Sequence, residues 1–196
     1  MKIVKSHPPI VACIAFAVLL FLAPIATAHA QPASATNRVL ELDGANSYVE
    51  LPPNAFSQLT DATIEGWVKW DRFALNTRFF DFGEQQCKIA LGQAGNRGLA
   101  LFVNSCGTDT DNNLGVENLL RTNQWCHLAA VVGRGGMRFY FNGQLVSTNG
   151  YTGTFTNLSG TSHCYLGWSG TFTNVAAFNG QLAKCVSGAP RGLRHK

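Results

Sequence analysis

From Arg38 onward the chain consists of short runs of strand-forming residues separated by clusters of Gly, Asn, Asp and Thr. Turn clusters at this spacing are typical of all-β sandwiches and barrels. The runs are Val39–Leu42, Tyr48–Leu51, Thr63–Trp70, Arg78–Phe82, Lys88–Leu91, Leu99–Val103, Trp125–Val132, Met137–Asn142, Gln144–Ser147 and Cys164–Trp168. Only 13% of the residues are charged, which disfavours a helical bundle because solvated helix faces need many Lys, Glu and Arg. We therefore expect an all-β domain.

Two local patterns make this expectation more specific. Asn142-Gly143 separates two strand-like runs, and a type I′ turn needs the positive φ that these residues tolerate. A hairpin of Arg138–Phe141 and Gln144–Ser147 is therefore predicted. Both alternating faces of the run from Trp125 to Val132 are apolar, which predicts a central strand covered on both sides. Trp125 and Phe139 are both expected in the core.

Residues 1–30 have the features of a secretory signal peptide. Lys2 and Lys5 form a basic region, Ile10–Ala23 is apolar, and Ala28-His29-Ala30 is a small-x-small cleavage site. A retained membrane anchor is the alternative, but the apolar run is shorter than the ~20 residues of a spanning helix. We expect a secreted or cell-envelope protein that begins at Gln31, with a linker over residues 31–37 and no membrane span in the mature chain.

The charge distribution disfavours nucleic acid as a partner. The formal net charge is +4, and two of the lysines leave with the signal peptide. The remaining basic excess is at the C-terminal end, where Lys184, Arg191, Arg194 and Lys196 have no acidic neighbour. A nucleic-acid footprint requires basic residues that cluster on the folded body.

Secretion permits disulfides. Cys87 and Cys106 lie just outside two adjacent strand candidates, Lys88–Leu91 and Leu99–Val103, and Cys126 and Cys164 lie in two later ones. We expect the pairs Cys87–Cys106 and Cys126–Cys164, with Cys185 left over. Sequence does not determine the connectivity, and buried free thiols are the alternative.

Four sequence blocks, spread over residues 37–182, carry a family resemblance. They are Leu42-Asp43-Gly44 with Tyr48–Leu51, Ala62–Lys69, Asn123–Ala129 with Met137–Val146, and Tyr165–Gly167 with Phe178–Leu182. In this order and spacing they resemble the laminin-G-like jelly roll of the concanavalin A-like lectin/glucanase superfamily. The resemblance implies a two-sheet antiparallel jelly-roll sandwich over residues 38–182. It also implies a non-catalytic module that binds glycans or extracellular proteins, in some members through calcium.

The resemblance ends at Leu182, where the family pattern continues into one more strand of the type acidic-acidic-Val-Arg-Val-Trp. Residues 183–196 are instead basic and lack strand periodicity. One permitted set of codons for this segment encodes Gly-Glu-Val-Arg-Val-Trp in another reading frame, which is compatible with a shifted frame. We expect an aberrant, disordered tail over residues 183–196. A truncated or frameshifted remnant without ligand is one alternative function.

A glycoside-active enzyme is the other alternative. Related glucanases place two carboxyl groups on one strand face, and retaining hydrolysis needs them about 5–5.5 Å apart. Glu41 and Asp43 begin such a pattern, but Asn46 occupies its third acidic position. We expect Glu41 to be solvated and Asp43 to bond backbone N–H groups in a turn. No catalytic residue is therefore predicted, and the alternative is tested by replacing Glu41 or Asp43.

The histidines also give no support for catalysis. No serine stands in a Gly-x-Ser-x-Gly elbow, so His127 and His163 have no triad to complete. We expect a buried His127 that bonds through one ring nitrogen, and an exposed His163 in a turn.

Candidate ligand-binding residues are aromatic side chains at strand ends or in Gly- and Thr-rich loops. They are Trp70, Tyr151, Phe155, Trp168 and Phe172. Exposed loop aromatics act as binding anchors, whereas aromatics that fold over the core edge only add packing. Both interpretations stand for each of these residues, and we expect a glycan or an extracellular protein as the partner.

No cofactor is called for by the sequence, and calcium is the one candidate. Asp109 and Asp111, with the asparagines that follow, place several oxygen ligands on one loop. The loop lacks the glycine and terminal glutamate of an EF-hand, and such clusters are also ordinary turn residues. Zinc is disfavoured because no cysteine pair has the required spacing.

Overall fold

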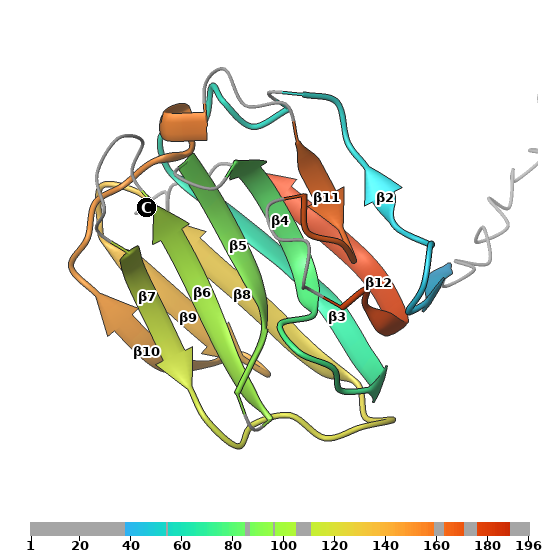
Figure 1. The fold of residues 1–196 in the computed structure, drawn as a ribbon. Helices are drawn as coiled ribbons and strands as arrows, with labels where there is room; N and C mark the ends of the chain where they lie inside the picture. Colours follow the sequence, from blue (N-terminus) through green and yellow to red (C-terminus); the bar gives the residue numbers. More distant parts are fainter. Residues whose placement is uncertain are drawn as a thin grey trace, which may run out of the picture. The chain divides into compact units, whose positions relative to one another are not determined.

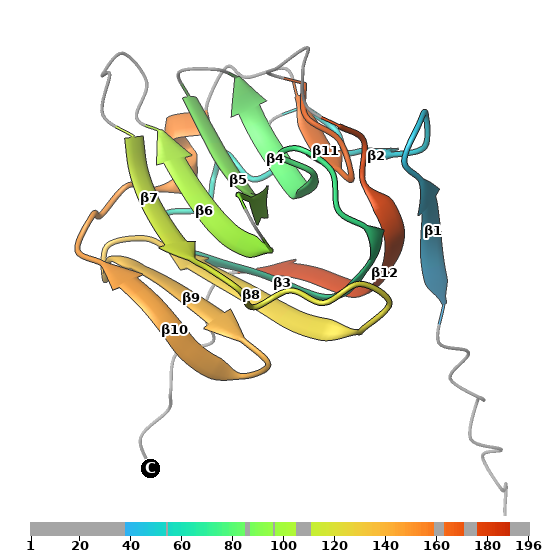
Figure 2. The same cartoon turned by 60° about the horizontal axis from the view of Figure 1, so that its bottom comes forward.

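The computed structural model describes residues 38–53, 55–84, 87–95, 97–104, 111–158, 163–170 and 176–188. These residues form a sandwich of two antiparallel six-stranded sheets (Figure 1). Figure 2 shows the two sheets as stacked layers. The all-β sandwich predicted from the sequence is confirmed.

The first sheet contains both the earliest and the latest described strand. Its order is β1 (Val39–Asp43), β12 (Asn179–Gly188), β3 (Ala62–Arg72), β8 (Cys126–Val132), β9 (Met137–Phe141) and β10 (Gln144–Asn149). The second sheet has the order β2 (Val49–Glu50), β11 (Cys164–Leu166), β4 (Arg78–Glu84), β5 (Cys87–Ala94), β6 (Gly98–Asn104) and β7 (Asp111–Val116). The described residues also include one 3₁₀ helix, η1 (Phe155–Leu158).

The core lies between the facing sides of the sheets because successive side chains of a strand point to opposite faces. In β3 the buried residues alternate with more exposed ones. Phe139 of β9 is fully buried, as predicted. Trp125 is only half-buried and precedes β8, so the prediction that it lies in the core is wrong. Its alternation partner His127 is also half-buried, because no element of the described chain covers the outer face of β8.

The predicted hairpin is confirmed. Gln144 pairs with Phe141 across a turn in which Asn142 has φ 49° and Gly143 has φ 79°. Both central residues thus have the positive φ that a type I′ turn requires.

Strand β12 extends beyond the predicted end of the domain. Residues 183–188, which were expected to belong to a disordered tail, continue the strand and pair with β3 as far as Gly188 and Thr63. The pairing shifts register between Ala183 and Val186, and Lys184 has φ 50° within this bulge. Backbone pairing with β3 needs no apolar alternation in the added strand, which is why the sequence pattern missed it. Residues 189–196 lie outside the described chain, and the reading-frame hypothesis remains a prediction for gene sequencing.

The cysteine predictions fare unequally. The pair Cys126–Cys164 is wrong, since both residues are buried thiols in strands of different sheets. The Sγ of Cys126 instead lies 3.4 Å from the backbone oxygen of Val68. Cys185 is a free thiol, as expected. Cys87 is disulfide-bonded, but Cys106 lies outside the described residues, so that pairing stays a prediction.

The predicted signal peptide and linker also lie outside the described residues. In the part of the chain that the structure does describe, no helix has the length and apolar character needed to cross a membrane.

Candidate functional site

The structure separates the five predicted ligand-binding aromatics. Trp70 and Phe155 lie in the core, with exposed fractions of 0% and 1%, so neither offers a face to a ligand. The indole Nε1 of Trp70 donates a hydrogen bond of 3.0 Å to Thr77 Oγ1, which completes its role inside the sandwich. Tyr151 is half-buried against the core, and Phe172 lies outside the described residues.

Trp168 follows β11 directly and joins three other rings, which we name the aromatic cluster: Tyr48, His163, Tyr165 and Trp168. The Tyr48 ring lies 5.8 Å from the Trp168 ring and 5.4 Å from the Tyr165 ring, between centroids. His163 stacks on Tyr165 at 5.4 Å, and its Nδ1 is 3.1 Å from the Tyr165 hydroxyl. Tyr48 is 45% exposed, so the cluster presents ring surface to solvent.

Sheet pairing explains how residues so far apart in sequence meet. Strand β11 lies between β2 and β4, with Tyr165 opposite Glu50 on one side and opposite Asp81 on the other. Tyr48 precedes β2, so β2 brings it beside Tyr165. Tyr48 and Tyr165 were not predicted as site residues, although both stand in strand candidates where alternation would direct them outward.

A polar group continues the same outer face of the second sheet, which Figure 1 views from the front. Asp81 is 1% exposed, and its Oδ2 accepts a hydrogen bond of 2.5 Å from Ser169 Oγ. Burial raises the pKa of Asp81, against the lowering effects of the Ser169 hydrogen bond and the charges of Arg78, Lys88 and His163. Asp81 Oδ1 has no hydrogen-bond partner among the described residues.

Two cations flank an aromatic ring on this face. The guanidinium carbon of Arg78 lies 4.7 Å from the centre of the Phe102 ring, and Lys88 Nζ lies 5.9 Å from it. Arg78 is 4% exposed, and burial lowers its pKa while the Asp81 charge raises it. Strand register places Asp81, Ala90 and Phe102 in one row across β4, β5 and β6. The face therefore combines exposed rings at one edge with enclosed charges near its centre.

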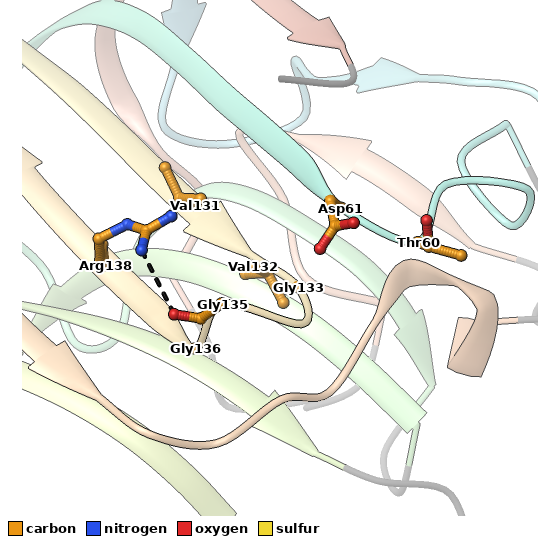
Figure 3. Close-up of a pocket in the computed structure, with 8 residues that line it drawn as sticks. All are labelled: Thr60, Asp61, Val131, Val132, Gly133, Gly135, Gly136 and Arg138. Carbon is orange, nitrogen blue, oxygen red and sulfur yellow. Dashed lines mark hydrogen bonds between the residues drawn. The ribbon is translucent and has the colours of Figure 1, made fainter. Parts of the chain in front are cut away.

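A hollow of about 290 Å³ lies at the end of the first sheet (Figure 3). A glycine-rich turn, Gly133 to Gly136, forms its floor, and Arg138 donates a hydrogen bond of 3.3 Å to Gly135 O. Asp61 accepts three hydrogen bonds from Arg134, at 2.7, 3.0 and 2.8 Å. Because these polar groups already bond one another, we interpret the hollow as structural. Its hydrogen bonds hold the glycine-rich turn in place.

The carboxylates considered for catalysis behave as expected from the sequence. Asp43 Oδ1 accepts hydrogen bonds from the backbone N–H groups of Ala45, Asn46 and Ser47, and from Ser47 Oγ at 2.7 Å. These bonds, that of the Ser47 hydroxyl first, hold the pKa of Asp43 far below its ordinary value. Asp43 is thus a turn residue, and Glu41 is exposed.

The remaining predictions concern histidine and metal. His127 is half-buried rather than buried, with Nε2 at 3.6 Å from Glu65 Oε2. The calcium prediction falls mainly outside the described chain, because Asp109 is not described and only the backbone of Asp111 is, as the start of β7. Strand β7 itself was missed, since its asparagines look like turn residues. Among the described residues, no cluster of His, Cys, Asp and Glu could hold a metal ion.

Comparison with known proteins gives one family match. Residues 43–185 match the family described as the concanavalin A-like lectin/glucanases superfamily. No curated protein matches the chain.

Several solved structures share the fold. A CBM40 of an IT-sialidase from Ruminococcus gnavus, bound to alpha2,3 sialyllactose, has a TM-score of 0.63 at 14% identity, covering 76% of this chain and 89% of that one. Domain 4 of AbnA, an extracellular GH43 arabinanase from Geobacillus stearothermophilus, in complex with arabinotriose, gives 0.61 at 24% identity, covering 76% and 69%. Mouse laminin alpha1 domains LG4-5 give 0.61 at 12% identity, covering 78% and 41%.

Proposed function

The chain belongs to the concanavalin A-like lectin/glucanases superfamily, and from this premise we propose that it is a secreted or cell-envelope module that binds a glycan without altering it chemically. Its neighbours in fold include carbohydrate-binding and laminin G domains. Fold alone does not determine function, so the proposal depends on a site in this chain.

The aromatic cluster is the observation that carries the proposal. Rigid rings with an exposed surface can pack against the apolar face of a sugar ring, while nearby polar groups bond its hydroxyls. Tyr48 and Trp168 supply the ring surface, with centroids 5.8 Å apart. The Tyr165 hydroxyl, the His163 ring and Glu50 border it on β2 and β11.

Two of the similar structures are named as sugar complexes: one is bound to sialyllactose and one is in complex with arabinotriose. Their identity to this chain is low, so we take from them only the general class of ligand. Calcium-dependent binding remains a prediction for the loop that holds Asp109 and Asp111.

The carboxylates support a non-catalytic role. Retaining and inverting glycosidases both need two carboxyl groups on either side of the scissile bond. Asp43, the carboxylate two residues from Glu41 on β1, is bonded into its turn and so is not placed to act with Glu41. Asp81 is enclosed and accepts a hydrogen bond from Ser169, so it is not open to a glycosidic bond.

A glycan array with the purified full chain tests the proposal, followed by calorimetric titration of the best ligand. Tyr48→Ala and Trp168→Ala are each expected to weaken binding by about 10- to 100-fold, as loss of an aromatic anchor does. Leu145→Ala removes an exposed apolar side chain from the other sheet and is the matched control. The proposal fails if no glycan binds, or if both aromatic variants bind as tightly as the control.

A further inference from the structure

The outer face of the first sheet has an exposed tryptophan near its centre. Trp67 of β3 points away from the core and is 41% exposed. Strand register places Ala183 of β12 on one side of it and His127 of β8 on the other. Its ring contacts the His127 ring edge-on, with centroids 5.4 Å apart, so one side of the indole is packed against β8.

A hollow lies beside this indole. It has a volume of about 350 Å³ and is lined by Val39, Trp67, Trp125, Ala183 and Lys184. The small side chain of Ala183, directly opposite Trp67, leaves the space open. The bulge in β12 places Lys184, at φ 50°, against the hollow, and bulges commonly redirect a side chain in this way.

The groups around the hollow carry positive and negative charges in similar number. Lys69 Nζ lies 3.4 Å from Asp71 Oδ1 and 5.9 Å from the centre of the Trp125 ring. Gln181 stands opposite Lys69 on β12, and Glu65 contacts His127 on the far side of Trp67. The rim therefore offers both donors and acceptors without a strong excess of either sign.

We propose that this hollow, the Trp67 site, binds an uncharged sugar ring of a polysaccharide, independently of the aromatic cluster on the opposite sheet. The proposal takes its ligand class from the proposed function. A pyranose or furanose ring has an apolar face for Trp67 and hydroxyls for Lys69, Lys184 and Gln181. The volume lies within the range of small-molecule sites, about 300–1,000 Å³.

A second copy of the chain is a less suitable occupant. A stable protein interface buries at least ~1,000 Å² and has an apolar centre. Here Glu65 and Lys69 are the neighbours of Trp67 on the same face of β3, and Lys69 pairs in turn with Asp71. A hollow with one exposed ring and a charged border fits a sugar better than a flat protein surface.

The test titrates the full chain with arabinotriose, xylohexaose, mannohexaose, cellohexaose and laminarihexaose, following tryptophan fluorescence and amide shifts. Two variants address the Trp67 site: Trp67→Ala removes the platform, and Ala183→Phe fills the hollow while keeping the indole. Each is expected to weaken binding at this site at least tenfold, whereas Leu145→Ala on the same sheet changes it less than twofold. Tyr48→Ala is expected to leave binding at the Trp67 site intact.

The outcomes separate the two proposals. If Tyr48→Ala abolishes all binding and Trp67→Ala none, the Trp67 site is refuted and the proposed function stands. If Trp67→Ala abolishes all binding and Tyr48→Ala none, the Trp67 site stands and the aromatic cluster is refuted. If no uncharged sugar perturbs β3 or β12, the Trp67 site is refuted. If Trp67→Ala instead converts a dimer to a monomer in sedimentation, a second copy covers this face and the inference is overturned.

Discussion

Two tryptophans of strand β3 have opposite surroundings. Trp70 faces the other sheet, is fully enclosed, bonds Thr77 and packs against Phe178 with ring centroids 5.1 Å apart. Trp67, three residues earlier, faces outward and is 41% exposed among Ala183, His127 and Glu65. The same residue type therefore serves the core on one side of the strand and a surface on the other.

The difference shows that position along the strand, rather than residue type, decides which aromatic can meet a ligand. A side chain at an inward position of β3 contacts the second sheet and cannot reach a ligand, whatever its residue type. An outward position offers only sheet neighbours and solvent. Inner-face changes should therefore affect folding, and outer-face changes should affect binding.

The largest effect is expected from Trp70→Ala. It removes a fully buried indole and leaves the enclosed Thr77 hydroxyl without its partner, so we expect a loss of ~3–5 kcal/mol in unfolding free energy. Urea unfolding followed by circular dichroism measures it. Trp67→Ala is the matched control and should lose about 1 kcal/mol or less. Equal losses in the two variants would refute the contrast between the faces.

Thiol reactivity sharpens the contrast further. Burial raises the pKa of Cys126 on the inner face to about 12, whereas Cys185 is exposed to solvent. Since the thiolate is the reactive form, iodoacetamide at about pH 8 should modify Cys126 in the native protein ~1000-fold more slowly than an ordinary thiol, and should modify Cys185 faster than Cys126.

Unfolding without reductant should then expose Cys126, Cys164 and Cys185 to alkylation, leaving Cys87 and Cys106 unmodified. Mass spectrometry of peptides identifies the modified sites. Rapid native modification of Cys126 would contradict its burial, and alkylation of Cys106 would contradict the predicted pair.

A third prediction concerns Asp81, an outward residue that is nevertheless enclosed. Its pKa is raised in the folded state, so its contribution to stability is complete below the ordinary Asp pKa and is lost as pH rises through the raised value. Wild type should therefore lose stability relative to Asp81→Asn as the pH rises above the ordinary pKa of an Asp carboxyl.

Asp43→Asn is the opposite control, because the pKa of Asp43 is lowered by the Ser47 hydroxyl and by backbone N–H groups. Wild type should gain stability relative to Asp43→Asn as pH rises from about 3. Urea unfolding across this range measures both trends. Trends of the same sign in the two variants would show that Asp81 is not buried as described.

The smallest effect is expected from Lys69→Ala, beside Trp67. A partly exposed pair such as Lys69–Asp71 contributes only ~0.2–1 kcal/mol, and salt should reduce this further. Chemical unfolding at low and high salt provides the measurement. A loss of unfolding free energy close to that of Trp70→Ala would mean that side chains of the outer face also stabilise the fold.

The all-β domain was predictable because strand alternation and turn residues are local properties, and the family resemblance specified the two-sheet sandwich. The Asn142-Gly143 turn and the hydrogen-bonded role of Asp43 followed for the same reason. Strand β7 and the end of β12 were missed, since pairing with β6 and β3 holds residues that lack local strand character.

The candidate site was only partly predictable. Trp168 was identified, but Trp70 at a strand end and Phe155 in a loop were also named as candidates, although both are buried in the core. Tyr48 and Tyr165 come together only through the pairing of β2 with β11, which no local pattern specifies. The alternation of inward and outward positions along β3 would have distinguished the exposed Trp67 from the buried Trp70 if one inward position had been known.

The place of β12 has a consequence for how the polypeptide is made. During synthesis β1 emerges first and β12 last among the described strands, yet β12 lies between β1 and β3. Until the ribosome has delivered residues 179–188, β1 has no partner strand and β3 has an open edge. Such long-range pairing is slow because the entropy of closing a long loop is lost before the strand contacts form and stabilise the chain. The first sheet therefore cannot be completed until these last residues have left the ribosome.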